Sequence, residues 1–444
     1  MLIFLLLFGF VLESIAGDSL KLSDAIRYAL DKNYSIQIVK KTSEIAKNNY
    51  STGNSGMLPK LDAYGGANIS MTNLEMELAG SRTTSDSGSS AGNMIISKDG
   101  NVTRNYNAGV DLNMTLFDGF AMFISYDKYE AIYDKSMIEI RFSIENMLKN
   151  LINTYFEALK LQQRLEILRE SISISKDRLN RTKDKVEYGA ALKIEVSKAE
   201  VDLNTDSSNF MQTELAYNNM IRNLNYVMGQ NISDKISLNK DIDLKPQPEF
   251  SSILSASMEK NSSLLKAIQD KKISEFDYKI VQSIYYPRIT FKTGYSFTRQ
   301  ESDAGYMLMN QNLGFNAALN ATFNLYDGSK TSIQSQNAQV NLFINEIKVE
   351  DTKKQIELAL TNAFDNFGRR KEIYNLEKEN VKTARDNYER AEELYKLGQL
   401  TSIEFRDAQI NLMNAKNRIN EALYSAKVAE SELLLIGGIY SDIE

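Results

Sequence analysis

The chain has 444 residues, of which 43% are hydrophobic and 25% charged, with only 4 Pro, a composition typical of an ordered, helix-rich protein. It contains no His and no Cys, which excludes zinc fingers, Ser-His-Asp and Cys-His catalysis, and disulfide frameworks. Because 52 basic residues face 58 acidic ones, the net charge is -6, and we expect no nucleic-acid partner and no cofactor.

The first residues predict export. An apolar run from Leu2 to Leu12 is followed by the small residues Ser14 to Gly17, which is the pattern of a signal peptide over residues 1–17. The run is too short to span a bilayer as a helix, which takes about 20 residues. No Lys or Arg precedes it, and a buried N-terminal helix is the alternative.

An internal duplication organises the remaining chain into residues 18–245 and 246–444. The segment Leu116-Phe117-Asp118-Gly119 recurs as Leu325-Tyr326-Asp327-Gly328, a shift of 209 positions (325 minus 116). Further pairs at this shift are Gly189 with Gly398, Ala199 with Ala408, Leu203 with Leu412, and Gly229 with Gly438; upstream, Asn33 pairs with Asn261 and Pro59 with Pro287. The first copy carries extra residues in a Ser- and Gly-rich stretch, Ser81 to Asp99, which predicts a solvated loop.

Each copy repeats one order of elements. Residues 22–57 and 250–285 read as helical segments that end just before a Pro. The period then changes to two, and we predict strands at about 61–72, 106–117, 289–298 and 313–326. Roughly 10 alternating residues suit a transmembrane β-strand with one lipid-facing side, although an antiparallel sheet with one wet face would show the same alternation.

Long helices follow the two Asp-Gly turns. Residues 119–189 contain no interior Gly or Pro, and 329–397 contain only Gly368; shorter helices are expected at 190–228 and 399–436. Residues Ala199, Leu203, Asp206 and Phe210 begin a seam with spacings of four and three, which indicates coiled-coil packing. Gly189 and Gly398 stand where each pair of helices reverses, so each copy predicts a helical hairpin.

Four strands form a sheet with two open edges, which lipid does not tolerate. If the strands cross a membrane, several chains must therefore join into a closed barrel. A hollow tube that begins in the outer membrane and continues into the periplasm is the architecture that follows.

In these features the chain resembles the TolC-type outer-membrane efflux and secretion channels. The resemblance covers nearly the whole mature chain and rests on the order of five features: Leu22-x-x-Ala25-Ile26-x-x-Ala29-Leu30-x-x-Asn33, Leu58-Pro59, the two Leu-aromatic-Asp-Gly turns, Tyr188-Gly189 and Leu397-Gly398. It implies a mainly α fold with a β-barrel portion, in which a homotrimer completes a 12-stranded barrel above an α-barrel of helical hairpins. It also implies a passive duct, docked by a periplasmic adaptor protein and served by an inner-membrane pump or ABC exporter.

The resemblance assigns roles to residues at the hairpin ends. An acidic constriction falls on Glu404 and Asp407, whose spacing places both carboxylates on one helical face. A lock between hairpins falls on Glu195 and Tyr395, but the Arg that completes it in the family is Leu400 here. Gly189 and Gly398 mark the ends where an adaptor would dock, although helix capping alone would explain both glycines.

Two other classes of function, a periplasmic scaffold and a hydrolase, are alternatives to a channel. A periplasmic coiled-coil adaptor or scaffold would carry long hairpins, but it would not need four amphipathic strands. A hydrolase with paired carboxylates needs no His, yet the sequence has no Walker A motif, dinucleotide Gly motif or G-x-S-x-G elbow. We therefore expect a channel rather than an enzyme.

Overall fold

The computed structural model describes residues 19–78 and 94–439, which form two units. The first holds residues up to 44, 135–268 and from 347 onward; the second holds 45–134 and 269–346. The expected signal peptide, residues 1–17, lies outside the described residues, and so do residues 81–93 of the expected loop. Residues 94–99 of that loop are part of a strand, so the loop prediction was wrong there.

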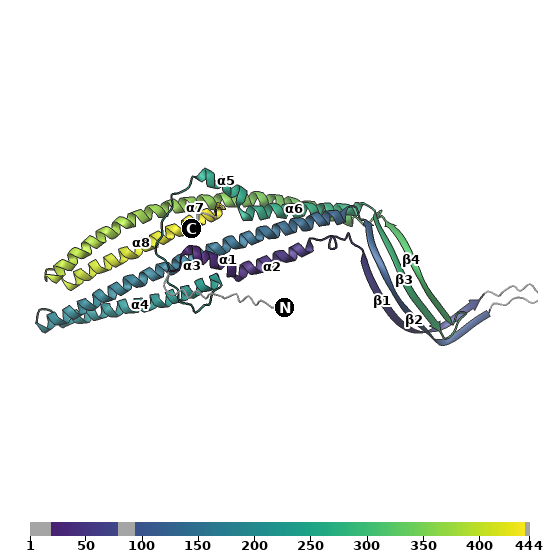
Figure 1. Cartoon of the computed structure of the whole chain (residues 1–444), viewed down its shortest axis with the longest axis horizontal. Coiled ribbons are helices and arrows are strands. Elements are labelled where there is room, and N and C mark those ends of the chain that lie inside the picture. Colours follow the sequence, from purple (N-terminus) through teal and green to yellow (C-terminus); the bar gives the residue numbers. More distant parts are fainter. Residues whose placement is uncertain (1–18, 79–93, 440–444) are drawn as a thin grey trace, which may run out of the picture. The chain divides into compact units, whose positions relative to one another are not determined.

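The second unit is built around one antiparallel sheet in which each strand pairs with the next, in the order β1-β2-β3-β4 (Figure 1). The strands are β1 (Lys60–Leu78), β2 (Met94–Phe117), β3 (Arg288–Ser302) and β4 (Met309–Thr322). β1 and β2 extend well past the expected 61–72 and 106–117, because their pairing continues from Leu74 opposite Lys98 to Leu78 opposite Met94. β4 ends at Thr322, ahead of the expected 326.

The strand register sorts side chains into two faces. Asp62 lies opposite Asp111, and Asp111 lies opposite Gly294; one position along, an adjacent row carries Leu61, Leu112 and Thr293. A Cβ on Gly294 would lie 2.2 Å from the Asp111 Oδ1, so only glycine fits beside this carboxylate. Since successive residues point to opposite faces, the sheet has one polar side and one mostly apolar side. Within the described sheet, β1 and β4 are edge strands with one partner each.

The first unit holds most of two helical hairpins, whose two long helices begin in the second unit. Helices α3 (Ala121–Glu187) and α4 (Lys193–Met228) form one, and α7 (Lys330–Lys396) and α8 (Ser402–Ile436) form the other (Figure 1). The long helices α3 and α7 have 67 residues each, and a continuous helix of that length extends about 100 Å. Apolar residues of α3 and α4 form a buried core that includes Leu151, Tyr155, Phe156, Leu159 and Leu224.

Each expected opening helix is divided in two. Helices α1 (Leu22–Lys32) and α2 (Tyr34–Asn49) replace the predicted 22–57, and α5 (Phe250–Lys260) and α6 (Ser262–Gln282) replace the predicted 250–285. An asparagine stands at each break, Asn33 and Asn261, in extended backbone conformation. The prediction of continuous helices was wrong because the Asn side chain binds backbone amides that a helix would otherwise use.

The two asparagines make equivalent hydrogen bonds. The Asn33 Oδ1 accepts from the Ser35 N at 2.9 Å, and its Nδ2 donates to the Val227 O at 2.8 Å. The Asn261 Oδ1 accepts from the Ser263 N at 3.0 Å, and its Nδ2 donates to the Ile436 O at 3.2 Å. Each asparagine therefore starts a helix and also satisfies a carbonyl at the end of α4 or α8. Among the described helices, none has a stretch long and apolar enough to cross a membrane.

Candidate functional site

The reversals of both hairpins are glycine-capped. Gly189 has φ +73° and Gly398 has φ +78°, a left-handed conformation that glycine adopts without strain. The Ala190 N donates to the Lys185 O at 2.7 Å, and the Gln399 N donates to the Leu394 O at 2.9 Å. These bonds satisfy the last carbonyls of α3 and α7 in the manner of a Schellman motif. No atom lies within 4 Å of the position of a Cβ on either glycine, so their surroundings are open.

The predicted constriction residues lie at the start of α8, and both are exposed. Glu404 closes a capping box: its Oε2 accepts from the Thr401 N at 2.9 Å and from the Thr401 Oγ1 at 2.7 Å. The hydrogen bond from the Thr401 side chain lowers the pKa of Glu404 below its ordinary value, so this carboxylate stays ionised at neutral pH. The structure therefore gives Glu404 a capping role, while Asp407 projects from the next turn.

Asp407 and Glu195 line one groove between α4 and α8, with a volume of about 560 Å³. The apolar wall of this groove is made of Ile194, Val201 and Ile403. Arg178 and Asp202 line it as well and form an ion pair with each other. The groove thus has Glu195 and Asp407, one of the two residues predicted to form the constriction, in its lining.

The ring contacts of Tyr395 are with Phe405 and Lys185. Its ring stacks on Phe405 with centroids 4.7 Å apart, and the Lys185 Nζ lies 4.7 Å from the ring centre. Within the described residues no hydrogen bond joins Glu195 to Tyr395, whose hydroxyl is buried without a partner. Leu400, which stands where the predicted lock would have an Arg, packs against this aromatic cluster. The link from Tyr395 to the first hairpin is therefore a cation–π contact with Lys185 on α3.

A buried polar network joins the two hairpins close to these ends. Asp206 on α4, 2% exposed, receives two hydrogen bonds from Arg406 on α8, Nη1 to Oδ2 at 2.8 Å and Nη2 to Oδ1 at 2.7 Å. The hydroxyls of Ser171 and Ser175 on α3 also donate to the Oδ2 of Asp206, at 3.0 and 2.7 Å. The Gln409 Nε2 on α8 donates to the hydroxyl of Ser171 at 3.1 Å.

The electrostatics of this network favour ionised partners. Burial by itself raises the pKa of Asp206, but the bonds from Arg406, Ser175 and Ser171 outweigh burial and hold the pKa below its ordinary value. A bidentate guanidinium–carboxylate pair is among the strongest polar contacts available to side chains. The sequence contained one signal of it, since Asp206 is the one charged residue in a seam of mostly apolar positions.

Comparison with known proteins decides the family. The model of the family described as "Outer membrane efflux protein" matches residues 25–230 and 253–438 of this chain. The chain belongs to the outer membrane efflux protein family. The two matched ranges fall within the two sequence repeats.

Relatives of this outer membrane efflux protein agree with the assignment. Outer membrane protein TolC of Vibrio cholerae is 18% identical over 320 residues, covering 71% of this chain and 73% of TolC. The Campylobacter jejuni CmeC outer membrane channel superposes with a TM-score of 0.75 at 16% identity, covering 94% of this chain and 85% of CmeC. A membrane protein from Pseudomonas aeruginosa superposes with a TM-score of 0.74 at 14% identity, and the match covers 94% of this chain and 90% of that protein.

The family settles several expectations. The resemblance to TolC-type channels and the predicted fold class, helical hairpins with a four-stranded sheet per chain, are confirmed. This outer membrane efflux protein is a channel of the outer membrane rather than an enzyme or a periplasmic scaffold. Within residues 19–78 and 94–439, no group of three or more Asp and Glu residues is placed to hold a metal ion.

Proposed function

We propose that the chain is the exit duct of a tripartite efflux pump or a type I secretion system. Three copies assemble into a channel that crosses the outer membrane and extends into the periplasm. An adaptor docks at the hairpin ends near Gly189 and Gly398, and an inner-membrane pump or ABC exporter supplies the energy. The channel itself transforms nothing chemically.

The observation that carries this proposal is the four-stranded sheet with two unpaired edges. In lipid, each unsatisfied backbone group costs several kcal/mol, so β1 and β4 must pair with strands of other chains. Three copies supply twelve strands, and a barrel of that size is wider than the eight-stranded barrels that side chains fill. The mostly apolar face, with Leu61 and Leu112, then meets lipid, and the face with Asp62 and Asp111 lines the lumen.

At the periplasmic end, we propose that Glu404 and Asp407 form the narrowest ring. Three copies would place six carboxylates around one opening, which attracts cations and repels anions. The capped, ionised state of Glu404 supports this role, because a protonated carboxyl would contribute no field. We further propose that Glu195 and Tyr395 take part in holding the ends closed, Tyr395 through its stacking on Phe405 and its contact with Lys185.

The test is the conductance of the purified protein in planar bilayers with and without a polyvalent cation such as hexamminecobalt(III). The wild type should conduct and be blocked from the periplasmic side. The double variant E404A/D407A should lose most of the block. The variant E200A, which removes an exposed acid on α4, should keep it. Absence of any current from the wild type would contradict the duct, and undiminished block of E404A/D407A would remove these residues from the constriction.

A further inference from the structure

The segment between α4 and α5 is a strap that crosses one face of the first unit. Its residues 232–249 contact three helices in succession. On α3, Gln162 accepts from the Leu238 N at 3.0 Å and donates to the Leu238 O at 3.1 Å. On α8, the Lys427 Nζ donates to the Asp243 O at 3.0 Å; on α7, the Phe364 O accepts from the Gln247 Nε2 at 3.0 Å. One face of α3, α8 and α7 is therefore covered.

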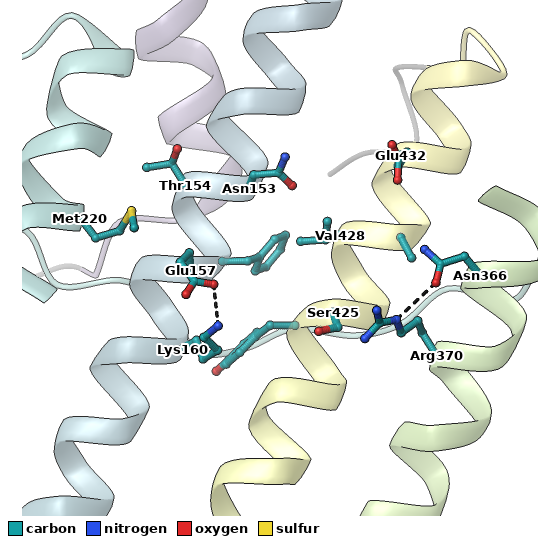
Figure 2. A pocket seen from close by; sticks show the side chains of 13 residues that line it. Asn153, Thr154, Glu157, Lys160, Met220, Asn366, Arg370, Ser425, Val428 and Glu432 are labelled. Carbon is teal, nitrogen blue, oxygen red and sulfur yellow. Dashed lines mark hydrogen bonds and ion pairs between the residues drawn. The ribbon is translucent and has the colours of Figure 1, made fainter. Parts of the chain in front are cut away.

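The opposite face of the same three helices carries a groove of about 460 Å³. On α3, Glu157 and Lys160 lie roughly half a turn away from Tyr155 and Gln162, which face the strap. On α7, Asn366 and Arg370 are each two residues, roughly half a turn, from Gly368, where a Cβ would lie 3.2 Å from the Gln247 Oε1 of the strap. On α8, Ser425 is likewise two residues from Lys427, which contacts the strap. Figure 2 looks onto this groove, with Glu157 and Lys160 on one side, Asn366 and Arg370 on the other, and Ser425 and Val428 between them.

The groove combines an apolar floor with a charged rim. The ring of Phe156 stacks on Tyr424 with centroids 6.1 Å apart, and Val428 extends this floor. On the rim, the Glu157 carboxylate is paired with the Lys160 ammonium at 2.7 Å (Figure 2). Glu432, a second rim acid, is paired with Lys149 at 2.7 Å. Both carboxylates that line the groove are thus neutralised by lysines.

Arg370 is the exception among the rim charges. Its Nε donates to the neutral amide of Asn366 at 3.3 Å, and within the described part of the chain it has no carboxylate partner. Arg370 is exposed, so its guanidinium is available to a ligand. Its neighbour Arg369 differs, because the Arg369 Nη1 is paired with the Glu372 carboxylate at 2.8 Å.

We propose that this groove is a contact site in the duct for amphipathic organic monoanions. The proposal rests on the proposed function: a strap on the inner face would obstruct the duct, so the strap lies outside and the groove faces the lumen. An aromatic or aliphatic body would lie on the partly exposed side chains of Met220 and Val428, above the buried rings of Phe156 and Tyr424. A carboxylate or sulfonate would accept hydrogen bonds from Arg370. An organic cation would meet carboxylates that already have partners, so the charge balance selects an anion.

The site differs from the constriction in what it recognises. The carboxylates of Glu404 and Asp407 attract cations, whereas the groove carries one uncompensated positive charge per chain. Three copies of the groove would give an anion three transient binding sites in the lumen. Weak binding suits a duct, because cargo must leave as readily as it enters.

The test uses 2-naphthalenesulfonate as the probe and the uncharged 2-naphthalenesulfonamide as its control. Binding to the full mature protein in a non-ionic detergent is measured by isothermal titration calorimetry for the wild type, R370Q and R369Q. We expect R370Q to weaken sulfonate binding about fivefold, the size of one partly exposed charge pair, and to leave sulfonamide binding unchanged. R369Q is the matched control and should bind the sulfonate like the wild type.

Two results would overturn the site: equal sulfonate affinity in R370Q and the wild type, or equal losses in R370Q and R369Q. Because both arginines are exposed, neither variant should disturb folding, which circular dichroism checks. Block of single-channel current by the same sulfonate is the second readout, and it should weaken in R370Q alone. A wild type that binds the sulfonate but carries no current would contradict the duct and the lumenal placement, whereas current whose block is unaffected by R370Q would contradict the groove only.

Discussion

Replacing Arg406 by Met should loosen the start of α8 far more than its position near a helix end would suggest. The substitution keeps the apolar stem but removes both bonds from the guanidinium to Asp206, which is 2% exposed. Asp206 would keep only its bonds from Ser171 and Ser175. Removing one partner of a buried ion pair costs about 3–5 kcal/mol, because the other charge stays buried without compensation.

The assay is hydrogen–deuterium exchange of peptides that cover α8, followed by mass spectrometry of the purified protein. A loss of about 3–5 kcal/mol in the free energy of local opening corresponds to exchange faster by about 10²-fold to 5 × 10³-fold for the first turns of α8. Substituting both partners, D206M/R406M, should restore much of the protection, since no buried charge remains.

The control for R406M is K416Q. Lys416 joins α8 to Glu170 on α3 at 2.5 Å, but Glu170 is half exposed, so this pair should contribute less than about 1 kcal/mol. Similar exchange in R406M and K416Q, or a double variant D206M/R406M that exchanges as fast as R406M, would refute the assignment of the hairpin contact to the buried pair.

Three further predictions follow from the geometry. Folding lowers the pKa of Asp206, so the stability that this residue contributes is present above the ordinary Asp pKa of about 4 and is lost as the pH falls through the lower pKa of the folded state. Hydrogen exchange of α8 in the wild type should therefore accelerate as the pH falls through this range. In D206M/R406M it should not. G189A and G398A each force a Cβ into a left-handed conformation at an open site, and each should lower stability by about 1 kcal/mol, seen as faster exchange and earlier proteolysis at the affected reversal only. N33A and N261A remove equivalent bonds to the Val227 and Ile436 carbonyls, and both should speed exchange at the end of α4 or α8, whereas N54A, an exposed local contact, should change neither.

Much of the architecture is encoded locally and could be predicted from the sequence. The hairpins follow from long stretches without Gly or Pro that end at Gly189 and Gly398, and the sheet follows from alternation with a period of two. The duplication then transfers each element of one repeat to the other. These signals persist at 14 to 18% identity because they depend on residue class and spacing rather than on particular side chains.

What the sequence missed depends on contacts between distant segments. The breaks at Asn33 and Asn261 arise because each side chain reaches the end of a helix in its own repeat, Val227 or Ile436, nearly two hundred positions away. The seam pattern indicates that Asp206 is a buried acid. It does not identify Arg406 as its partner, because Arg406 is on the other hairpin. The groove at Arg370 requires three helices to lie side by side, and residue spacing within one helix does not reveal it.

The proposed channel requires that three copies close one barrel. The most direct measurement is the mass of the mature protein purified from outer membranes in a mild detergent, determined by native mass spectrometry. We expect a complex of three chains that dissociates only under denaturing conditions. A stable single chain that stays folded without detergent would contradict it, because the edges of β1 and β4 would then need no partner.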